Sequence, residues 1–476
     1  MDIFKVKAPK DFVYYMVFTS FVICEFLPIL NLLNPIILFA VKASLSWLFY
    51  YFVYQKDRKL FHLFIFTTIL SIFSTIIAYH NVYMYISGIG KYLIGHTMCF
   101  IYMQIGIFLM KHGSSQLKNW LRNTLFGFAI ITAMTSLLVL QKVPVAVREL
   151  DNGSGHIKGM ETILYSMNTA TWGLLYGMVF LLPIAIIWFK YTKNIWMLFW
   201  IGIVELLVFK SQLSMAILFS AVFLTSLFIK PMSPRKLTIL GLICLASKTV
   251  ILDILAYATY YLYDLFRSIW PHDLFAYRLH QLHLLFAGQQ VEGTVGARFS
   301  LYEMSLQTFL ENPILGYTSG DVFQSIGRHS QIFDFLASAG LAGSMPIAVA
   351  FIFVVREMIH CIRDEEVKQY FFLSLIMLTI LMFLNPTYYA RAVYLSMFWG
   401  PSLVENRPLK IGNASKFDKK IIHNTRNHKW KEIVCANCYH YAGWFSKLWQ
   451  YSPTICFAAI FNAVCESCGW YLAYKG

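Results

Sequence analysis

Residues 168–189 read NTATWGLLYGMVFLLPIAIIWF and include no charged side chain. A helix of this length rises about 33 Å, close to the thickness of the hydrocarbon core of a bilayer. The stretch therefore predicts a membrane-spanning helix, and comparable apolar runs recur along the chain. We predict twelve such spans, near residues 12–32, 34–54, 60–79, 94–110, 124–140, 168–189, 195–209, 214–229, 237–257, 339–359, 369–385 and 388–404.

The composition of the whole chain agrees with this interpretation. Of its 476 residues, 58% are hydrophobic and only 13% are charged, whereas about a quarter of an ordinary soluble domain is charged. We therefore expect an all-α fold, a polytopic membrane helical bundle. The short basic start at Met1–Lys10 precedes a first span without a small-residue cleavage site, which favours an uncleaved first helix.

The net charge of +15 follows the expected topology rather than a polyanionic partner. Basic residues gather in alternate loops, near 56–59, 111–122, 190–193 and 230–236, which is typical of cytoplasmic loops. Nucleic acid is not expected as a partner, and anionic membrane lipids are. With the N-terminus inside, the external loops are 80–93, 141–167 and the long one at 258–338. We expect four regions: helices one to nine (1–257), the external loop (258–338), helices ten to twelve (339–404) and a basic cytoplasmic tail (405–476).

Polar chemistry concentrates in residues 298–343, RFSLYEMSLQTFLENPILGYTSGDVFQSIGRHSQIFDFLASAGLAG. The first part predicts a helix with Arg298 in its first turn and with one apolar face, and Asn312-Pro313 should end it. A second helix is expected to begin near Asp321 or Arg328 and to end at Gly340. The apolar face consists of Phe299, Tyr302, Leu306, Phe309 and Leu310.

This arrangement resembles the signature loop of the O-antigen ligase and polymerase family, the Wzy-type and WaaL-type membrane glycosyltransferases. The resemblance covers an Arg that opens a helix, the sequence ENPILGY, and His329 before the small-residue pair Gly340 and Gly343. Two positions differ from the usual pattern: Thr318 stands where a second glycine is common, and Ser330 where asparagine is common.

The resemblance implies a polysaccharide polymerase in the bacterial cytoplasmic (inner) membrane, with its active site on the periplasmic or extracellular face. Such an enzyme transfers a growing O-antigen, capsule or exopolysaccharide chain from undecaprenyl pyrophosphate to the next lipid-linked repeat unit. Arg298 and Arg328 would hold the departing pyrophosphate, because guanidinium groups bind phosphate oxygens bidentately. His329 would accept or orient the proton of the acceptor hydroxyl. The competing interpretation is that Arg328 and His329 only begin a helix.

Four more residues are candidates for contacts with pyrophosphate or lipid. Arg267 and Arg278 complete an external loop whose only cations are arginines. Ser211 matches the serine of a Ser-Arg-Gly element of the family, and Gln212 takes the place of its arginine, so Lys210 or Gln212 is the candidate for that contact. Lys210 is equally compatible with an interfacial lysine that extends toward water.

Three other functions remain open. A ligase of the WaaL type would transfer the finished glycan to lipid A core or to a protein through the same loop. A polysaccharide flippase would be a transporter and no enzyme, and a scaffold or chain-length protein would need neither arginine. A chain-length regulator and a flippase are possible partners of a polymerase. No nucleotide, dinucleotide or metalloprotease motif occurs, so we expect a metal-independent enzyme without a cofactor.

Cysteines and buried charges leave further alternatives. Cys435, Cys438, Cys465 and Cys468 form two Cys-x-x-Cys pairs that are either a structural zinc site or reduced, unliganded thiols. His96 is interpreted as a packing or interface residue. Each charged residue within the predicted spans should find an ionic partner or a water-filled cavity, since burial in hydrocarbon costs about 2.5 kcal/mol or more. These residues are Glu25, Lys42, Glu205, Lys210, Lys248 and Asp253.

Overall fold

A computed structural model describes residues 10–82, 89–147, 159–228, 247–269, 274–289, 294–317 and 325–404, with the single positions 150, 236 and 239. The chain divides into two units, Met1–Arg407 and Pro408–Gly476, and all described residues belong to the first. The described part of the chain is helical and contains no strand, which confirms the predicted all-α class.

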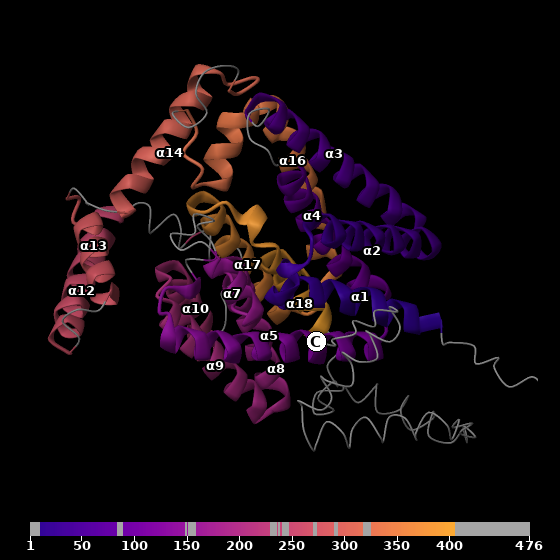
Figure 1. Cartoon of the computed structure of the whole chain (residues 1–476), viewed down its shortest axis with the longest axis horizontal. Helices are drawn as coiled ribbons and strands as arrows, with labels where there is room; N and C mark the ends of the chain where they lie inside the picture. Colours follow the sequence, from indigo (N-terminus) through magenta and orange to yellow (C-terminus); the bar gives the residue numbers. More distant parts are fainter. Residues whose placement is uncertain are drawn as a thin grey trace, which may run out of the picture. The chain divides into compact units, whose positions relative to one another are not determined.

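The first half of the unit consists of five long helices and one short 3-10 turn (Figure 1). Local signals set their ends: the side chain of Asn34 caps α2 by accepting a bond from the Ile36 N–H, and Ser114 caps α5 in the same way through Leu117. The elements are α1 (Lys10–Phe26), η1 (Pro28–Leu32), α2 (Pro35–Lys56), α3 (Arg58–Val82), α4 (Ile89–His112) and α5 (Ser115–Lys142).

The second half begins with α7 (Met160–Ser166), α8 (Trp172–Thr192), α9 (Ile195–Ser211) and α10 (Ser214–Thr225). The hairpin of α12 (Lys248–Ile269) and α13 (Leu274–Phe286) follows, and then α14 (Thr294–Glu311). The last elements are α16 (Gln331–Cys361), α17 (Glu365–Leu384), η2 (Thr387–Tyr389) and α18 (Arg391–Val404). The long helices α3 and α16 pack side by side (Figure 1).

Seven helices of the described residues are long and apolar enough to cross a membrane. They cover Ile36–Lys56, Arg58–Ala78, Leu93–His112, Ser115–Lys142, Trp172–Thr192, Gln331–Cys361 and Glu365–Leu384. Shorter apolar helices occupy Phe12–Phe26 and Ser214–Thr225. A total of twelve spans therefore stays a prediction, while a helical protein with several membrane-spanning segments is established. The predicted loop boundaries at 257 and 338 both fall inside helices, α12 and α16.

Helices α4, α8 and α18 lie at the centre of the bundle. Small residues permit their close approach: a Cβ on Gly177 would lie 2.5 Å from the Cβ of Ala392, so α8 and α18 touch through their backbones. The indole of Trp399 is fully buried between these helices and donates to the Tyr102 carbonyl oxygen over 3.0 Å. Such packing fixes the positions of α4 and α18, which both contribute to the sites described below.

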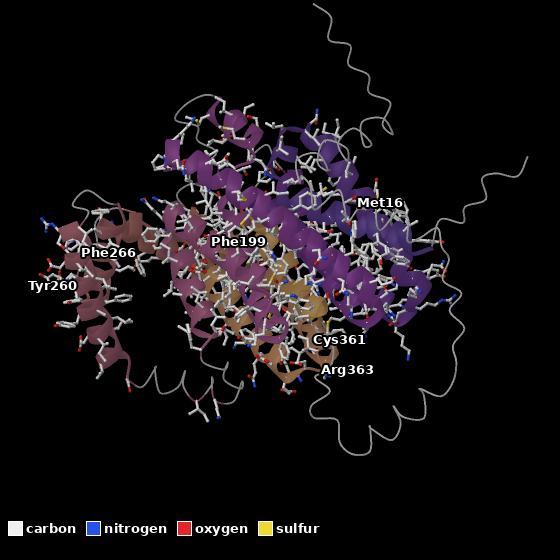
Figure 2. All side chains as sticks on the ribbon, turned by 90° about the horizontal axis from the view of Figure 1, so that it is seen from below. Met16, Phe199, Tyr260, Phe266, Cys361 and Arg363 are labelled. Atoms are coloured by element: carbon white, nitrogen blue, oxygen red, sulfur yellow. The ribbon has the colours of Figure 1, made fainter. Side chains whose placement is uncertain are left out.

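Large apolar side chains also cover the outside of the bundle. Met16 and Phe199 are 53% and 51% exposed and extend outward from their helices (Figure 2). A water-soluble protein would not expose so many large apolar groups, whereas lipid chains cover them at no cost. The exposed surface thus agrees with the apolar composition.

Two of the charged residues predicted within spans pair with each other. The Nζ atom of Lys42 lies 2.5 Å from Oε1 of Glu25, and both side chains are buried. Asp253 instead is exposed on α12, and the side chain of Lys248 lies outside the described residues. The expectation of an ionic partner is therefore confirmed for Glu25 and Lys42.

Candidate functional site

Helix α14 and the start of α16 carry the residues that the sequence singled out. Helix α14 ends at Glu311, directly before Asn312-Pro313 as predicted. The predicted start near Asp321 lies outside the described residues. Helix α16 begins at Gln331, three residues after the alternative start at Arg328, because the buried Ser330 caps it by accepting from the Phe333 N–H over 3.2 Å. Asparagine, which is common at this position in the resembling family, is an equally good N-cap, so serine preserves the local structure.

The predicted helix end at Gly340 is a break inside a longer helix. Gly340 adopts φ +56° and ψ −162°, and α16 resumes after it and continues to Cys361. The N–H groups of Leu341 and Ala342 would lose their partners at this break, but they donate to the carbonyl oxygens of Pro313 and Ile314 over 2.8 and 2.9 Å. The ENPILGY segment therefore closes the break in α16.

The apolar face of α14 contacts α16 only in part: the ring of Tyr302 lies against that of Phe333, with centroids 6.0 Å apart. Phe299 and Leu310 are 51% and 67% exposed, whereas Ser305 is fully buried and Thr308 nearly so. A polar stripe meets the start of α16 because this stripe supplies hydrogen-bond partners to the turn before it. The apolar residues share one side of the helix, as the sequence predicts.

Ser305 and Asp334 fix the turn at 327–330. The Ser305 hydroxyl donates to Oδ1 of Asp334 over 2.7 Å and accepts from the Gly327 N–H over 2.9 Å. The other carboxylate oxygen, Oδ2, accepts from the Ser330 N–H over 2.8 Å. Helix α14, the turn and helix α16 are thereby joined at a single carboxylate.

Arg328 adopts a left-handed backbone conformation, with φ +59°. This conformation costs a residue with a β-carbon roughly 1 kcal/mol or more, and such strain is found most often at functional sites. The contacts of Asp334 with the surrounding turn hold it in place. As a result, Arg328 and His329 leave the turn in directions that a regular helix start would not give them.

The structure brings Arg298, Arg328 and His329 together. Burial lowers the pKa of the half-buried His329 below its ordinary 6.5, and the positive charges of Arg298 and Arg328 lower this pKa further. Arg298 also acts on Tyr302, whose pKa burial raises and the guanidinium lowers. Two cations and a neutral imidazole therefore share one neighbourhood, and that imidazole can accept a proton at neutral pH.

A cavity of about 40 Å³, lined by both polar and apolar side chains, lies beside Arg328. Arg328, Ser330 and Asp334 form one part of its wall. Its volume suffices for one or a few water molecules and is far too small for a sugar. The cavity can therefore hold ordered water next to Arg328, and a glycan would have to bind elsewhere on this surface.

The sequence did not indicate the opposite wall of the cavity. The side-chain amide of Gln331 accepts from the Tyr388 N–H over 3.1 Å, and its Nε2 lies 2.9 Å from Nε2 of His96. The first bond fixes the orientation of the amide, so Gln331 donates and His96 accepts. The His96 ring also stacks on Tyr388 with centroids 4.7 Å apart. His96 is thus part of a polar network, and the interpretation as a packing residue was incomplete.

Three of the other predicted contact residues, Lys210, Gln212 and Arg267, do not line this cavity. Lys210 is exposed at the end of α9, and Gln212 forms the left-handed C-cap of that helix with φ +54°. Arg267 is exposed on α12 and donates to the Tyr263 hydroxyl over 3.0 Å. The side chain of Arg278 lies outside the described residues. The roles proposed for these four residues stay predictions.

No metal site is found among the residues that the structure describes, where no three His, Cys, Asp or Glu side chains gather suitably. The predicted zinc ligands Cys435, Cys438, Cys465 and Cys468 lie outside those residues.

Comparisons of the chain with protein-family models, with curated proteins and with solved structures find no match. The fold and its surface define the class of the protein, a membrane-embedded protein built of α-helices.

Proposed function

We propose that the protein is a membrane glycosyltransferase that polymerises undecaprenyl-pyrophosphate-linked oligosaccharide repeat units on the outer face of the cytoplasmic membrane. The observation that carries this proposal is the shared neighbourhood of Arg298, Arg328 and His329 at the junction of α14 and α16. The resemblance of the same segment to polysaccharide polymerases and ligases supports it independently.

The protein must make two contributions to the reaction: it must stabilise the leaving pyrophosphate and accept the proton of the acceptor hydroxyl. The acceptor hydroxyl attacks the anomeric carbon of the donor sugar, a new C–O bond forms, and the bond from that carbon to the pyrophosphate oxygen breaks. The electron pair leaves with the pyrophosphate, so positive charge must stabilise it. Arg298 supports this role because no hydrogen bond or ion pair joins its guanidinium to another described residue.

The proton of the acceptor hydroxyl must go to a base. His329 suits this step because its lowered pKa keeps the imidazole neutral at the pH of the cell surroundings. Burial favours the neutral form of His329, and the two arginines that hold the diphosphate add to this effect. One arrangement of charges thus supports both parts of the transfer.

The proposal is tested with purified protein in liposomes that contain a lipid-linked repeat unit. We expect Arg298→Ala and His329→Ala each to lower the rate of polymer formation by about 100-fold or more, as is typical for the loss of an electrostatic or acid–base group. Arg356→Ala is the matched control, because it removes an exposed arginine of α16 that does not line the cavity and has no predicted contact with substrate. Normal chain lengths in both test variants would contradict the site.

The same variants in cells separate the other functions. Long lipid-linked polymer that is never attached to its final acceptor in a deletion strain would identify a ligase instead. Accumulation of single repeat units on the cytoplasmic face would identify a flippase. Loss of polymer with repeat units present on the outer face supports the polymerase.

A further inference from the structure

We infer that a second anion site lies within the helical bundle, formed by Glu25, Lys42, Tyr102 and Arg391, and that it binds the phosphate group of a membrane lipid. We call these four residues the charge cluster. The inference is independent of whether the protein polymerises glycans, because the cluster shares no residue with the site at Arg298, Arg328 and His329.

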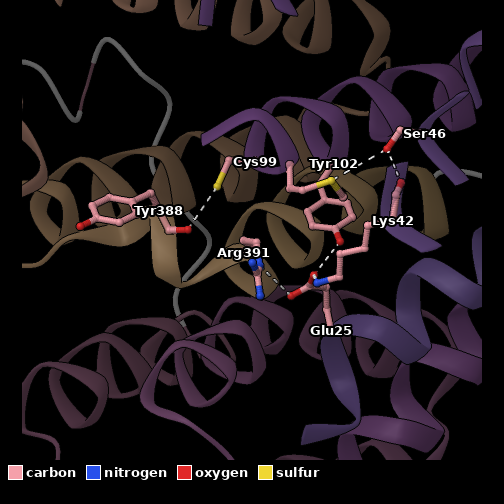
Figure 3. Close-up of polar contacts among 8 residues, drawn as sticks. Glu25, Lys42, Ser46, Cys99, Tyr102, Tyr388 and Arg391 are labelled. Atoms are coloured by element: carbon pink, nitrogen blue, oxygen red, sulfur yellow. Dashed lines mark hydrogen bonds and ion pairs between the residues drawn. The ribbon is translucent and has the colours of Figure 1, made fainter. Parts of the chain in front are cut away.

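The charge cluster joins four helices around one carboxylate (Figure 3). Oε1 of Glu25 accepts from Nζ of Lys42 over 2.5 Å and from the Tyr102 hydroxyl over 2.7 Å. Oε2 of Glu25 accepts from Nε of Arg391 over 3.3 Å. Helices α1, α2, α4 and α18 each contribute one of these side chains.

The cluster contains more basic than acidic groups. One carboxylate faces Lys42 and Arg391, so the cluster is neutral with Lys42 deprotonated and carries one net positive charge with Lys42 protonated. An uncompensated cation in a low-dielectric interior is costly and marks a functional site by default. An anionic ligand would remove this cost.

Arg391 still has donors for such a ligand. Its Nε is bonded to Glu25, while its terminal amino groups form no hydrogen bond to any other described residue. Its side chain is 25% exposed, whereas those of Lys42 and Glu25 are 3% and 6% exposed. The open side of the guanidinium fork and the nearby ammonium are a typical pair for phosphate oxygens.

The apolar surroundings of the cluster indicate a lipid rather than a soluble anion. His96, Cys99 and Tyr102 follow at three-residue steps on α4, so the cluster lies about 9 Å along this helix from the cavity beside Arg328. Cys99 connects the two through a 4.0 Å contact of its Sγ with the Tyr388 carbonyl oxygen. Around the connection of α1 and α2, exposed apolar side chains offer a surface for a hydrocarbon chain. These are Ile29, Leu32, Leu33, Ile36 and Ile37.

The test measures binding of undecaprenyl phosphate to the purified full-length protein by native mass spectrometry. All samples carry Arg298→Ala, so that binding at the proposed catalytic site does not mask the second site. We expect Arg391→Gln to weaken binding at least tenfold and Arg391→Lys to retain part of it. Arg356→Gln, which removes an exposed arginine of α16 with no predicted ligand contact, is the matched control and should bind like its parent. Equal binding with and without Arg391→Gln would overturn the inference.

Two further ligands test whether the charge cluster recognises the phosphate group and whether it requires the lipid chain. Undecaprenol has the same chain without phosphate and should bind at least tenfold more weakly; equal binding would overturn the phosphate contact. Inorganic phosphate should not displace the lipid at equal concentration, and displacement would assign the cluster to a free anion and overturn the lipid assignment.

A measurement on the unsubstituted protein covers the case that Arg391→Gln fails to fold. A photoreactive undecaprenyl phosphate should crosslink to peptides of the four helices of the cluster, α1, α2, α4 or α18, and crosslinks confined to other helices would overturn the inference. Loss of polymerisation in any of these proteins bears on the proposed function and not on whether the charge cluster binds a lipid.

Discussion

Gly316 lies directly against Gly340, although 23 residues separate them in the chain. A Cβ on either residue would come within 2.5 Å of the backbone nitrogen of the other, and both residues have positive φ, +75° and +56°. The contact seats the ENPILGY segment in the break of α16, and the hydrogen bonds from Leu341 and Ala342 then become possible. This pair of glycines thus sets the distance between α14 and the turn that carries Arg328 and His329.

Replacement of either glycine by alanine should damage this junction. Gly316→Ala and Gly340→Ala each introduce a methyl group that meets backbone atoms, and each forces a positive φ on a residue with a β-carbon. The backbone strain alone costs roughly 1–3 kcal/mol, and the steric contact adds to it. We expect a lower unfolding temperature for both variants in detergent, measured by fluorescence-detected size-exclusion chromatography after heating.

Two other glycines separate the two causes. Gly288 has φ +67°, but a methyl group on it would meet no described atom within 4 Å beyond its chain neighbours, so Gly288→Ala reports the backbone strain without the clash. Gly202 lies in α9 with open space and without positive φ, and Gly202→Ala should be neutral or slightly stabilising. We therefore expect the lowest unfolding temperatures for Gly316→Ala and Gly340→Ala, an intermediate one for Gly288→Ala and the highest for Gly202→Ala. A different order would refute the explanation.

Local signals in the sequence are sufficient for several features of this region. Asn312-Pro313 ends α14 because proline restricts the residue before it, and this effect needs no tertiary contact. Gly340 predicts a helix end, yet α16 resumes beyond it because Pro313 and Ile314 supply carbonyl oxygens to the broken helix. No pattern within 331–361 could reveal these acceptors, since they lie in a different segment.

The candidate site likewise combines residues that the local sequence predicts with residues that only the packing of the helices reveals. A short segment of sequence predicts Arg298, Arg328 and His329 as a group, and the structure places them within electrostatic reach of one another. His96 and Arg391 lie in other helices, and in the sequence they are a lone histidine and a lone arginine in apolar surroundings. Only the packing of α4 against α16 and of α18 against α1 gives them polar neighbours.

Ser330 offers a test of the helix start that positions His329. Ser330→Ala removes the acceptor for the Phe333 N–H and should cost about 1 kcal/mol of stability, while Ser330→Asn restores a capping oxygen and should cost much less. Thermal unfolding of both variants in detergent measures this difference. If alanine and asparagine lower the unfolding temperature equally, the serine does not act as a cap.

The charge cluster predicts a large effect at a residue distant from the candidate site. Glu25→Gln would leave the buried Lys42 and the partly exposed Arg391 without their carboxylate, and breaking a buried ion pair in this way typically costs about 3–5 kcal/mol. Glu205→Gln is the matched control. Like Glu25→Gln it neutralises one glutamate in a helix, here α9, but it breaks no ion pair among the described residues. We expect low yield or early unfolding for Glu25→Gln alone; equal stability of the two variants would contradict the cluster.

His329 should give the enzyme a characteristic dependence on pH. Burial and the charges of Arg298 and Arg328 lower its pKa below 6.5, so the imidazole stays neutral down to a lower pH than a free histidine does. If the neutral form accepts the proton of the acceptor hydroxyl, the rate should be level near pH 7 and should fall only below pH 6.5. A plot of polymerisation rate against pH measures this fall.

The cause of the shift can be tested without activity. Arg298→Gln removes one of the two positive charges and should raise the pKa of His329 toward 6.5, whereas Arg298→Lys keeps a charge and should leave the pKa low. Titration of the histidine by nuclear magnetic resonance in protein with labelled imidazole carbons, with His329→Gln for assignment, provides both values. An unchanged pKa in Arg298→Gln would mean that Arg298 does not act on His329, and the two residues would then not form one site.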